Sequence, residues 1–312
     1  MSPSRTRWLP PRARLEPVTE PADGWLERDG VSLHYVEWKG PEVGSSANAP
    51  VLLLHGLSSN ARYWDRVAIH LGGRRVVALD QRGHGLTGRP PHAPNPDTGY
   101  AMEQLVEDAV FASGKLGLDK PIVVGHSWGA TVALELVGTR PEVASALVFI
   151  DGPIQSAANM FSWDEAQKIM QPPLPRFARM DDAMAESGRD FGGAWNTDLE
   201  PFVRARVVRD GSAFVLTLTA AMRLELLRGL YDSQPDVLWP RVEVPAAALL
   251  ARGGPAAISS WKERGAALLA KQAPRVEIRW FDTPHDIPLY APAEVAAEIE
   301  RVSSPAAASP GS

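Results

Sequence analysis

One serine in this sequence lies in the setting of a covalent nucleophile. The run Gly125-His126-Ser127-Trp128-Gly129 follows the apolar stretch Ile122-Val123-Val124, and a helical pattern begins at Ala130. In a strand–turn–helix of this kind the turn is sharp, so the residues two before and two after the serine must lack bulk, and both are glycine. The turn also brings the free N–H groups of a helix start beside the serine hydroxyl, where an oxyanion would form.

A general base for this serine is found far downstream. Trp280-Phe281 leads into Asp282-Thr283-Pro284-His285-Asp286, so His285 directly follows the last strand pattern. The other histidines have simpler explanations. His55, His84 and His126 fall in tight turns, where an imidazole braces a loop through hydrogen bonds. We therefore assign Ser127 as nucleophile and His285 as general base.

The elements that must position these residues alternate along the chain. Short continuous apolar runs separated by amphipathic helical patterns indicate a parallel sheet covered on both faces. The runs are Val51–Leu54, Arg75–Leu79, Ile122–Val124, Ala146–Ile150, Ala246–Leu250 and Val276–Phe281, and the helical patterns are Ala61–Leu71, Met102–Gly114, Trp128–Thr139 and Ala293–Val302. Before them, Asp29-Gly30 predicts a type I′ hairpin turn.

Composition and the chain ends narrow the possible partners. The net charge of −5 argues against a nucleic-acid or anionic-membrane partner, and no apolar run reaches the length of a membrane span. There are no cysteines and no metal-binding histidine spacing, so we expect no disulfide and no metal. We expect a cytoplasmic protein, with which the lack of cysteine is compatible, and a serine nucleophile needs no cofactor. Residues 1–24 and 303–312 are predicted to be disordered tails.

The interval between Ile150 and Ala246 interrupts the alternation. It is far longer than a crossover helix requires, and it is rich in aromatic residues, prolines and charges. We expect a mostly helical insertion at residues 153–240, carried by a core made of residues 25–152 and 241–302.

From about Trp25 to Val302 the chain resembles an α/β-hydrolase fold enzyme of the esterase or lactonase type. The motifs that carry the resemblance are His55-Gly56, Asp80 to Gly85, Gly125 to Gly129 and His285. The resemblance implies an eight-stranded, mostly parallel α/β sheet with the site at the carboxyl ends of the strands and a helical cap after the sixth strand. It also implies an oxyanion hole made of the Leu57 and Trp128 N–H groups, and a turn-stabilising role for Asp80.

The third member of a Ser-His-acid triad departs from the commoner pattern of the family. Many relatives place the acid after the seventh strand, but here the stretch from Ala251 to Ser260 holds no carboxylate. Asp151, which directly follows the sixth strand pattern, is the acid we predict. Glu263, Asp282 and Asp286 remain alternatives.

These residues predict a serine hydrolase that cleaves a small hydrophobic ester or lactone through an acyl-enzyme. An apolar, aromatic pocket wall is expected from Trp64, Met160, Phe161 and Trp163. Carbon–carbon bond hydrolases, amidases and perhydrolases of the same fold stay open, as does a ligand-binding protein with little turnover. The elbow also resembles that of epoxide hydrolases and dehalogenases, which need a carboxylate nucleophile, and Ser127 argues against both.

Overall fold

The computed structural model describes residues 20–40, 48–90 and 99–304. Most of both predicted tails, residues 1–19 and 305–312, lies outside the described residues. The first strand begins at Ala22, inside the segment expected to be disordered.

Eight strands form the main sheet, in the order β1-β2-β4-β3-β5-β6-β10-β11. The hairpin β1–β2 is antiparallel. The other six strands, β4, β3, β5, β6, β10 and β11, run parallel to one another. Asp29 and Gly30 both have positive φ, which is the backbone of the predicted type I′ turn. In chain order the strands are β1 Ala22–Arg28, β2 Val31–Trp38, β3 Val51–Leu54, β4 Val76–Leu79, β5 Ile122–His126, β6 Ala146–Ile150, β10 Ala246–Ala251 and β11 Val276–Phe281.

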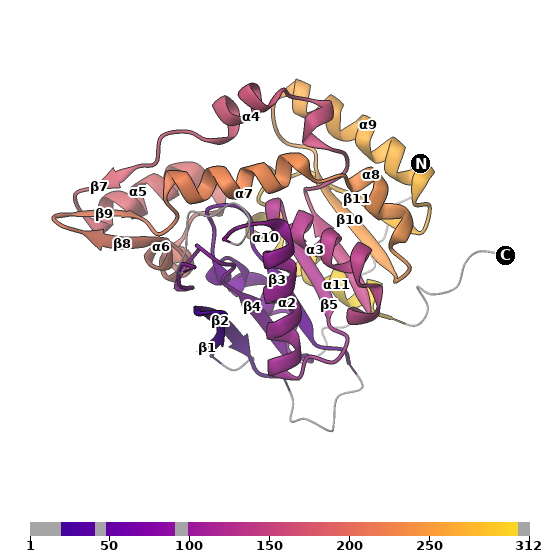
Figure 1. The fold of residues 1–312 in the computed structure, drawn as a ribbon, viewed down its shortest axis with the longest axis horizontal. Coiled ribbons are helices and arrows are strands. Elements are labelled where there is room, and N and C mark those ends of the chain that lie inside the picture. The colour runs from indigo at the N-terminus through magenta and orange to yellow at the C-terminus, as the bar shows by residue number, and fades with distance from the viewer. Residues whose placement is uncertain (1–19, 41–47, 91–98, 305–312) are drawn as a thin grey trace, which may run out of the picture.

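Helices cover both faces of this sheet (Figure 1). On one face α2 (Met102–Leu116), α3 (Trp128–Thr139) and α9 (Ala256–Gln272) bury alternate strand residues such as Leu52 and Leu54. On the other face α1 (Asp65–Ala68) and α11 (Pro292–Val302) bury the intervening residues, such as Val51 and Leu53. The buried strands therefore consist of continuous apolar runs because both of their faces lie in a core.

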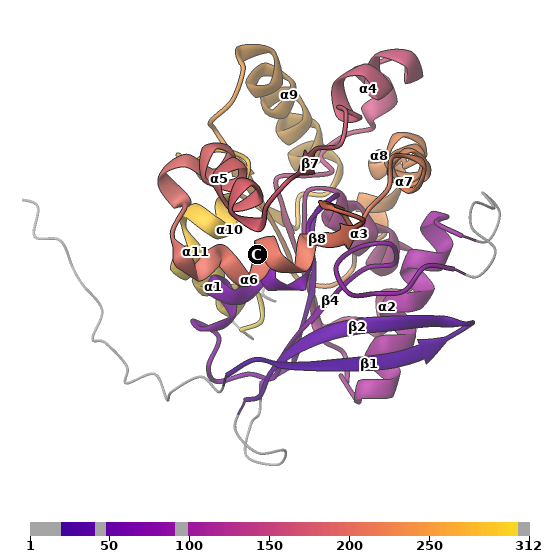
Figure 2. The ribbon, with the colours of Figure 1, turned by 90° about the vertical axis from the view of Figure 1, so that its left-hand side faces the viewer.

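The segment between β6 and β10, called the cap here, is mixed in structure. Its helices are α4 Trp163–Met170, α5 Met180–Phe191, α6 Glu200–Arg206, α7 Ala220–Asp232 and α8 Pro235–Leu238. It also contains a three-stranded antiparallel sheet of β7 Arg176–Phe177, β9 Ala213–Leu216 and β8 Val207–Asp210, which the sequence reading did not anticipate. Figure 2 shows these helices in two groups, with α5 and α6 on one side and α4, α7 and α8 on the other.

Candidate active site

Ser127 occupies the sharp turn between β5 and α3. Its φ of 53° and ψ of −120° lie in a region that side-chain-bearing residues rarely adopt. A Cβ on Gly125 would lie 2.3 Å from the Gly129 carbonyl oxygen, and one on Gly129 would lie 2.3 Å from the His55 carbonyl oxygen. Only glycine fits at either position. The Ser127 N–H donates to the Ile150 carbonyl at 2.8 Å, which ties the strained turn to the neighbouring strand.

Asp151 lies at the end of β6, facing His285 from the loop after β11. Its Oδ2 accepts a hydrogen bond from His285 Nδ1 at 2.5 Å, and its Oδ1 accepts one from the Ala251 N–H at 2.9 Å. The Asp151 side chain is fully buried, whereas the His285 side chain is 49% exposed. Burial alone would raise the pKa of Asp151, but the hydrogen bond and charge of His285, followed by those of Lys262, outweigh it and lower the pKa below its ordinary value.

The alternative acids point elsewhere. Asp282 is 90% exposed and pairs with Arg252 at 3.4 Å. Asp286 accepts a hydrogen bond from the Tyr63 hydroxyl at 3.0 Å. Glu263 is exposed on α9. Among the described residues, the carboxylate that contacts the His285 ring is that of Asp151.

Lys262 is a residue of this site that the sequence reading missed. It lies on α9 with its side chain 8% exposed. Its Nζ donates to Asp151 Oδ2 at 2.6 Å and to the Ala251 carbonyl oxygen at 3.1 Å. A signal was available, since Lys262, Ala266 and Leu269 recur at helical spacing, which puts the lysine on the apolar stripe of its helix.

His126, the residue before the serine, packs beneath the His285 loop. Its ring stacks on Tyr63 at 4.9 Å, and its Nε2 donates to the His285 carbonyl oxygen at 3.1 Å. Burial, followed by the charge of His285, lowers the pKa of His126 to about 4. His126 is therefore neutral at physiological pH and braces the loop that carries His285.

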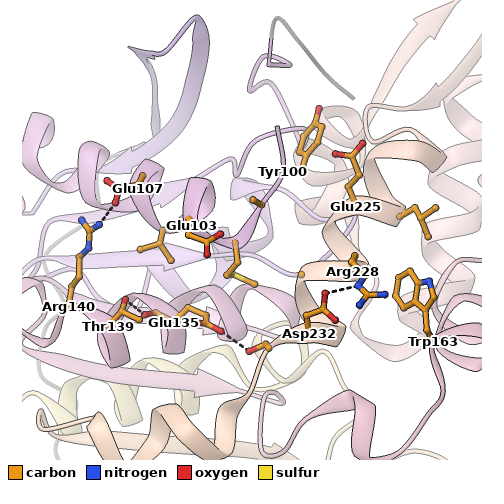
Figure 3. A pocket seen from close by; sticks show the side chains of 16 residues that line it. Tyr100, Glu103, Glu107, Glu135, Thr139, Arg140, Trp163, Glu225, Arg228 and Asp232 are labelled. Atoms are coloured by element: carbon orange, nitrogen blue, oxygen red, sulfur yellow. Dashed lines mark hydrogen bonds and ion pairs between the residues drawn. The ribbon is translucent and has the colours of Figure 1, made fainter. Parts of the chain in front are cut away.

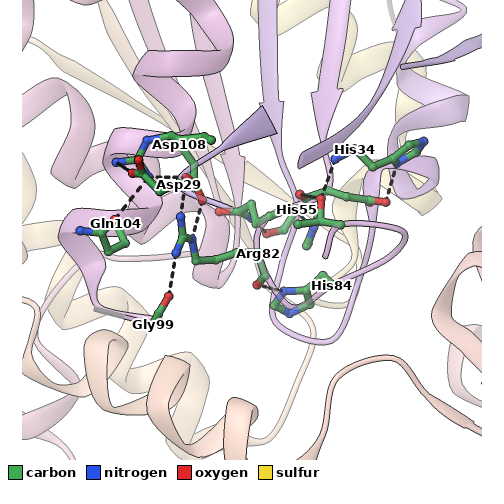
Figure 4. Close-up of polar contacts among 12 residues, drawn as sticks. Asp29, His34, His55, Arg82, His84, Gly99, Gln104 and Asp108 are labelled. Carbon is green, nitrogen blue, oxygen red and sulfur yellow. Dashed lines mark hydrogen bonds and ion pairs between the residues drawn. The ribbon is translucent and has the colours of Figure 1, made fainter. Parts of the chain in front are cut away.

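Two more histidines brace the glycine-rich turn after β4 (Figure 4). His55 Nε2 accepts from the Gln81 N–H at 3.1 Å, and His84 Nε2 accepts from the Ser58 N–H at 3.0 Å. Burial lowers the pKa of both rings. Asp80 accepts from the Ala61 N–H at 2.6 Å, which fits the turn-stabilising role expected of it.

A cavity of about 310 Å³ opens beside Ser127 and His285. Its lining is mixed rather than apolar. Arg206, Arg223, Glu186 and Asp190 of the cap contribute to it. Apolar contributions come from Leu57, Leu174, Phe191, Phe202 and Leu216.

Comparison with known proteins identifies the chain. Its residues 49–267 match the sequence profile of the alpha/beta hydrolase fold. The chain belongs to the α/β-hydrolase family. It is 28% identical over 260 residues to the lipase LipV of Mycobacterium tuberculosis, which covers 82% of this chain and 94% of the lipase. It is 32% identical over 136 residues to epoxide hydrolase 1 of Caenorhabditis elegans, a match covering 42% of this chain and 31% of that enzyme. The crystal structure of E-2-(acetamidomethylene)succinate hydrolase superposes with a TM-score of 0.75 at 19% identity, covering 91% of this chain and 99% of that one.

The four side chains expected to form the pocket wall of this hydrolase lie elsewhere. Trp64 is fully buried in the core, and Met160 and Phe161 do not line the cavity around Ser127. Trp163 lines a second cavity of about 750 Å³ between α2, α3 and α7, where Arg228 lies over its ring at 5.0 Å (Figure 3). The charged side chains that the cap presents to the site come from α5, α6 and α7, whereas the segment after α4 contributes prolines and Leu174.

The described part of this hydrolase holds no helix with the length and apolarity that a bilayer crossing requires.

Proposed function

We propose that this α/β hydrolase cleaves a carboxylic ester or lactone through a Ser127-His285-Asp151 triad. The observation that carries the proposal is the 2.5 Å contact between Asp151 Oδ2 and His285 Nδ1 at the edge of a cavity that Ser127 also lines. A carboxylate at Nδ1 keeps the proton on that nitrogen, so Nε2 is left free to accept one.

In the first half-reaction the Ser127 hydroxyl attacks the substrate carbonyl carbon and gives its proton to His285. The C–O bond to the alcohol then breaks, and the departing oxygen takes that proton. A water activated by His285 hydrolyses the acyl-enzyme in the second half-reaction. Asp151 stabilises the imidazolium that forms in each half.

The oxyanion of each tetrahedral intermediate would be held by the N–H groups of Leu57 and Trp128. Trp128 is the first residue of α3, so its N–H has no carbonyl partner within the helix. The positive end of the helix dipole adds to the stabilisation of a negative oxygen there.

Epoxide hydrolysis is disfavoured despite the sequence relatives that carry that name. Attack of a serine hydroxyl on an epoxide carbon would leave an ether, which water does not cleave under mild conditions. A carboxylate nucleophile would leave an ester that water can cleave, but the nucleophile position here is Ser127.

The charged residues that line the cavity favour a more polar substrate than the hydrophobic one expected from the sequence. Arg206 has a buried Nε without a hydrogen-bond partner, and burial lowers the pKa of its guanidinium although Asp190 and Glu186 act against this shift. Asp190 and Glu186 offset part of the charge of Arg206, but its unpaired Nε still leaves a donor that a polar or anionic substrate group could satisfy. We therefore propose a substrate that carries an anionic or strongly polar group rather than a wholly apolar one.

Labelling and turnover test this function separately. A fluorophosphonate probe should label Ser127 stoichiometrically, and labelling should disappear in Ser127→Ala. The enzyme should hydrolyse p-nitrophenyl esters; binding of such esters without turnover would instead support a ligand-binding protein.

The substrate charge is tested by comparing p-nitrophenyl butyrate with the p-nitrophenyl monoester of succinate. Arg206→Met should lower kcat/KM for the succinate monoester at least about tenfold, the discrimination expected from one charged contact, and change the butyrate ester little. Arg204→Met is the matched control, because Arg204 lies on the same helix and is exposed. Equal losses on both esters would refute the anionic substrate but not the triad.

A further inference from the structure

Two nitrogen donors share a single oxygen of Asp151. His285 Nδ1 lies 2.5 Å and Lys262 Nζ lies 2.6 Å from Oδ2, so the two nitrogens are within about 5 Å of each other. Lys262 donates otherwise to the Ala251 carbonyl oxygen, at the end of β10. The buried ammonium of Lys262, in direct contact with Asp151, therefore changes the electrostatic potential at the His285 ring.

This potential decides whether the surroundings of His285 favour its protonated or its neutral form. A lone buried carboxylate stabilises imidazolium over neutral imidazole. An ammonium on the same oxygen offsets that negative charge and disfavours imidazolium. The neutral form, which is the one able to accept the Ser127 proton, then persists to lower pH.

We propose that Lys262 is a positioning residue that extends the activity of the Ser127–His285 pair to lower pH by offsetting the charge of Asp151. The inference rests on the proposed function, because it concerns the base of that reaction. Lys262 also fixes the carboxylate in place, since it joins Oδ2 to the end of the neighbouring strand.

The other titratable and charged groups described near His285 do not offset the charge of Asp151. His126, at 4.8 Å between ring centroids, is neutral above pH 5 because its pKa is about 4. Asp286 is engaged by the Tyr63 hydroxyl. Arg206 and Arg223 line the cavity, but neither contacts Asp151. Among the described residues, Lys262 is the lysine or arginine that ion-pairs with the acid.

The test removes the charge and keeps the length of the side chain. In Lys262→Met the acid limb of the kcat/KM profile should move up by about one pH unit, as expected for a unit charge at about 5 Å in a partly exposed site. The substrate is p-nitrophenyl acetate, read at a wavelength where both forms of nitrophenol absorb equally. Lys271→Met, an exposed lysine on the same helix, is the matched control and should leave the limb in place.

A second measurement does not depend on turnover. The imidazole of His285 is titrated by NMR in Ser127→Ala with and without Lys262→Met, its resonance being assigned by its loss in His285→Gln. The midpoint should rise by the same amount as the kinetic limb. If the wild type hydrolyses no ester, the proposed function fails while this titration still tests Lys262.

Lys262→Gln keeps a hydrogen-bond donor toward Asp151 without the charge, and should move both readouts in the same direction as methionine. Activity loss with an unmoved limb and an unmoved midpoint would overturn the proposal, leaving a lysine that only compensates a buried carboxylate. Failure of both neutral variants to fold would overturn it as well, because a positioning role requires that the site assemble without the charge.

Discussion

Replacing Asp151 by Asn keeps the shape of the side chain and changes what it can accept. In the wild type Oδ1 accepts from the Ala251 N–H at 2.9 Å, while Oδ2 accepts from His285 at 2.5 Å and Lys262 at 2.6 Å. An amide offers one oxygen and one NH₂ group. In either orientation its NH₂ therefore faces another donor, either the Ala251 N–H or the pair formed by Lys262 and His285.

The expected kinetic loss is set by the tautomer of His285. Without an acceptor at Nδ1 the ring no longer holds Nε2 free for the Ser127 proton, and the comparable change in a serine protease lowers kcat about 10⁴-fold. His285 is 49% exposed, so water replaces part of the lost acceptor. We expect a loss between about 10² and 10⁴, or roughly 3 to 5 kcal/mol of transition-state stabilisation.

The same substitution leaves the Lys262 ammonium buried without its counter-charge. Breaking a buried ion pair from one side costs about 3–5 kcal/mol of stability, so the variant must first be shown to be folded by circular dichroism and a cooperative melt. The assay is kcat on p-nitrophenyl acetate at pH 8.

Asp282→Asn and Glu263→Gln are the controls, since both side chains are exposed and neither touches His285. Each should change kcat less than about threefold. A folded Asp151→Asn enzyme within tenfold of the wild type would refute the assignment of Asp151 as the acid.

Three further predictions follow from single contacts. Gly129→Ala should destabilise the protein by about 3 kcal/mol in a denaturant melt, because its Cβ would lie 2.3 Å from a backbone oxygen, whereas Gly114→Ala in α2 has open space and should be neutral or stabilising. Burial lowers the pKa of His126 from 6.5 to about 4, so the folded state binds this proton less readily than the unfolded state does. The free energy of unfolding should therefore decrease as the pH is lowered from 6.5 to 4, by roughly 3 kcal/mol for this residue. His126→Gln should show a correspondingly smaller acid loss in melts from pH 7 to 4, and an unchanged slope would contradict this. Trp163→Ala should leave kcat/KM within about twofold on any ester, because Trp163 lines the second cavity; a tenfold fall would place it back in the substrate path.

The sheet could be predicted closely because burial on both faces leaves a direct trace in sequence. Val51–Leu54, Ala146–Ile150 and Val276–Phe281 are strands with the bounds that their apolar runs predict. The turn at Ser127 could be predicted for a similar reason, since a Cβ added at either of its glycines would lie 2.3 Å from a backbone oxygen. Both signals come from residues close together in the sequence, and both reflect burial and steric fit rather than hydrogen-bond or ion-pair partners.

The cap could not be predicted to the same degree. The aromatic residues of this interval were expected to line the pocket around Ser127, but composition does not say which of two cavities a side chain faces. Trp163 faces the cavity between α2, α3 and α7, whereas Arg206 and Asp190 face Ser127. Orientation within an insertion depends on how its helices dock on the core, which is a property of tertiary packing.

The contact of Asp151 with His285 could be predicted from the sequence, whereas that of Lys262 with Asp151 could not, and the two outcomes have different physical reasons. Asp151 and His285 each follow a strand, and the carboxyl ends of parallel strands meet at one edge of a sheet, whatever lies between them in sequence. Lys262 comes from the helix that follows β10, and that helix, Ala256–Gln272, was absent from the predicted set. The spacing of Lys262, Ala266 and Leu269 is a signal for this helix, but it is a weak one because a lysine occupies one of the apolar positions. A charged residue at an apolar-stripe position is costly to bury alone, and here its compensation is the carboxylate at the end of β6. The chain has no carboxylate from Ala251 to Ser260, after β10. Instead Asp151, which follows β6, meets Lys262 across the end of β10, and we propose that this pair provides the acid of the triad and its counter-ion.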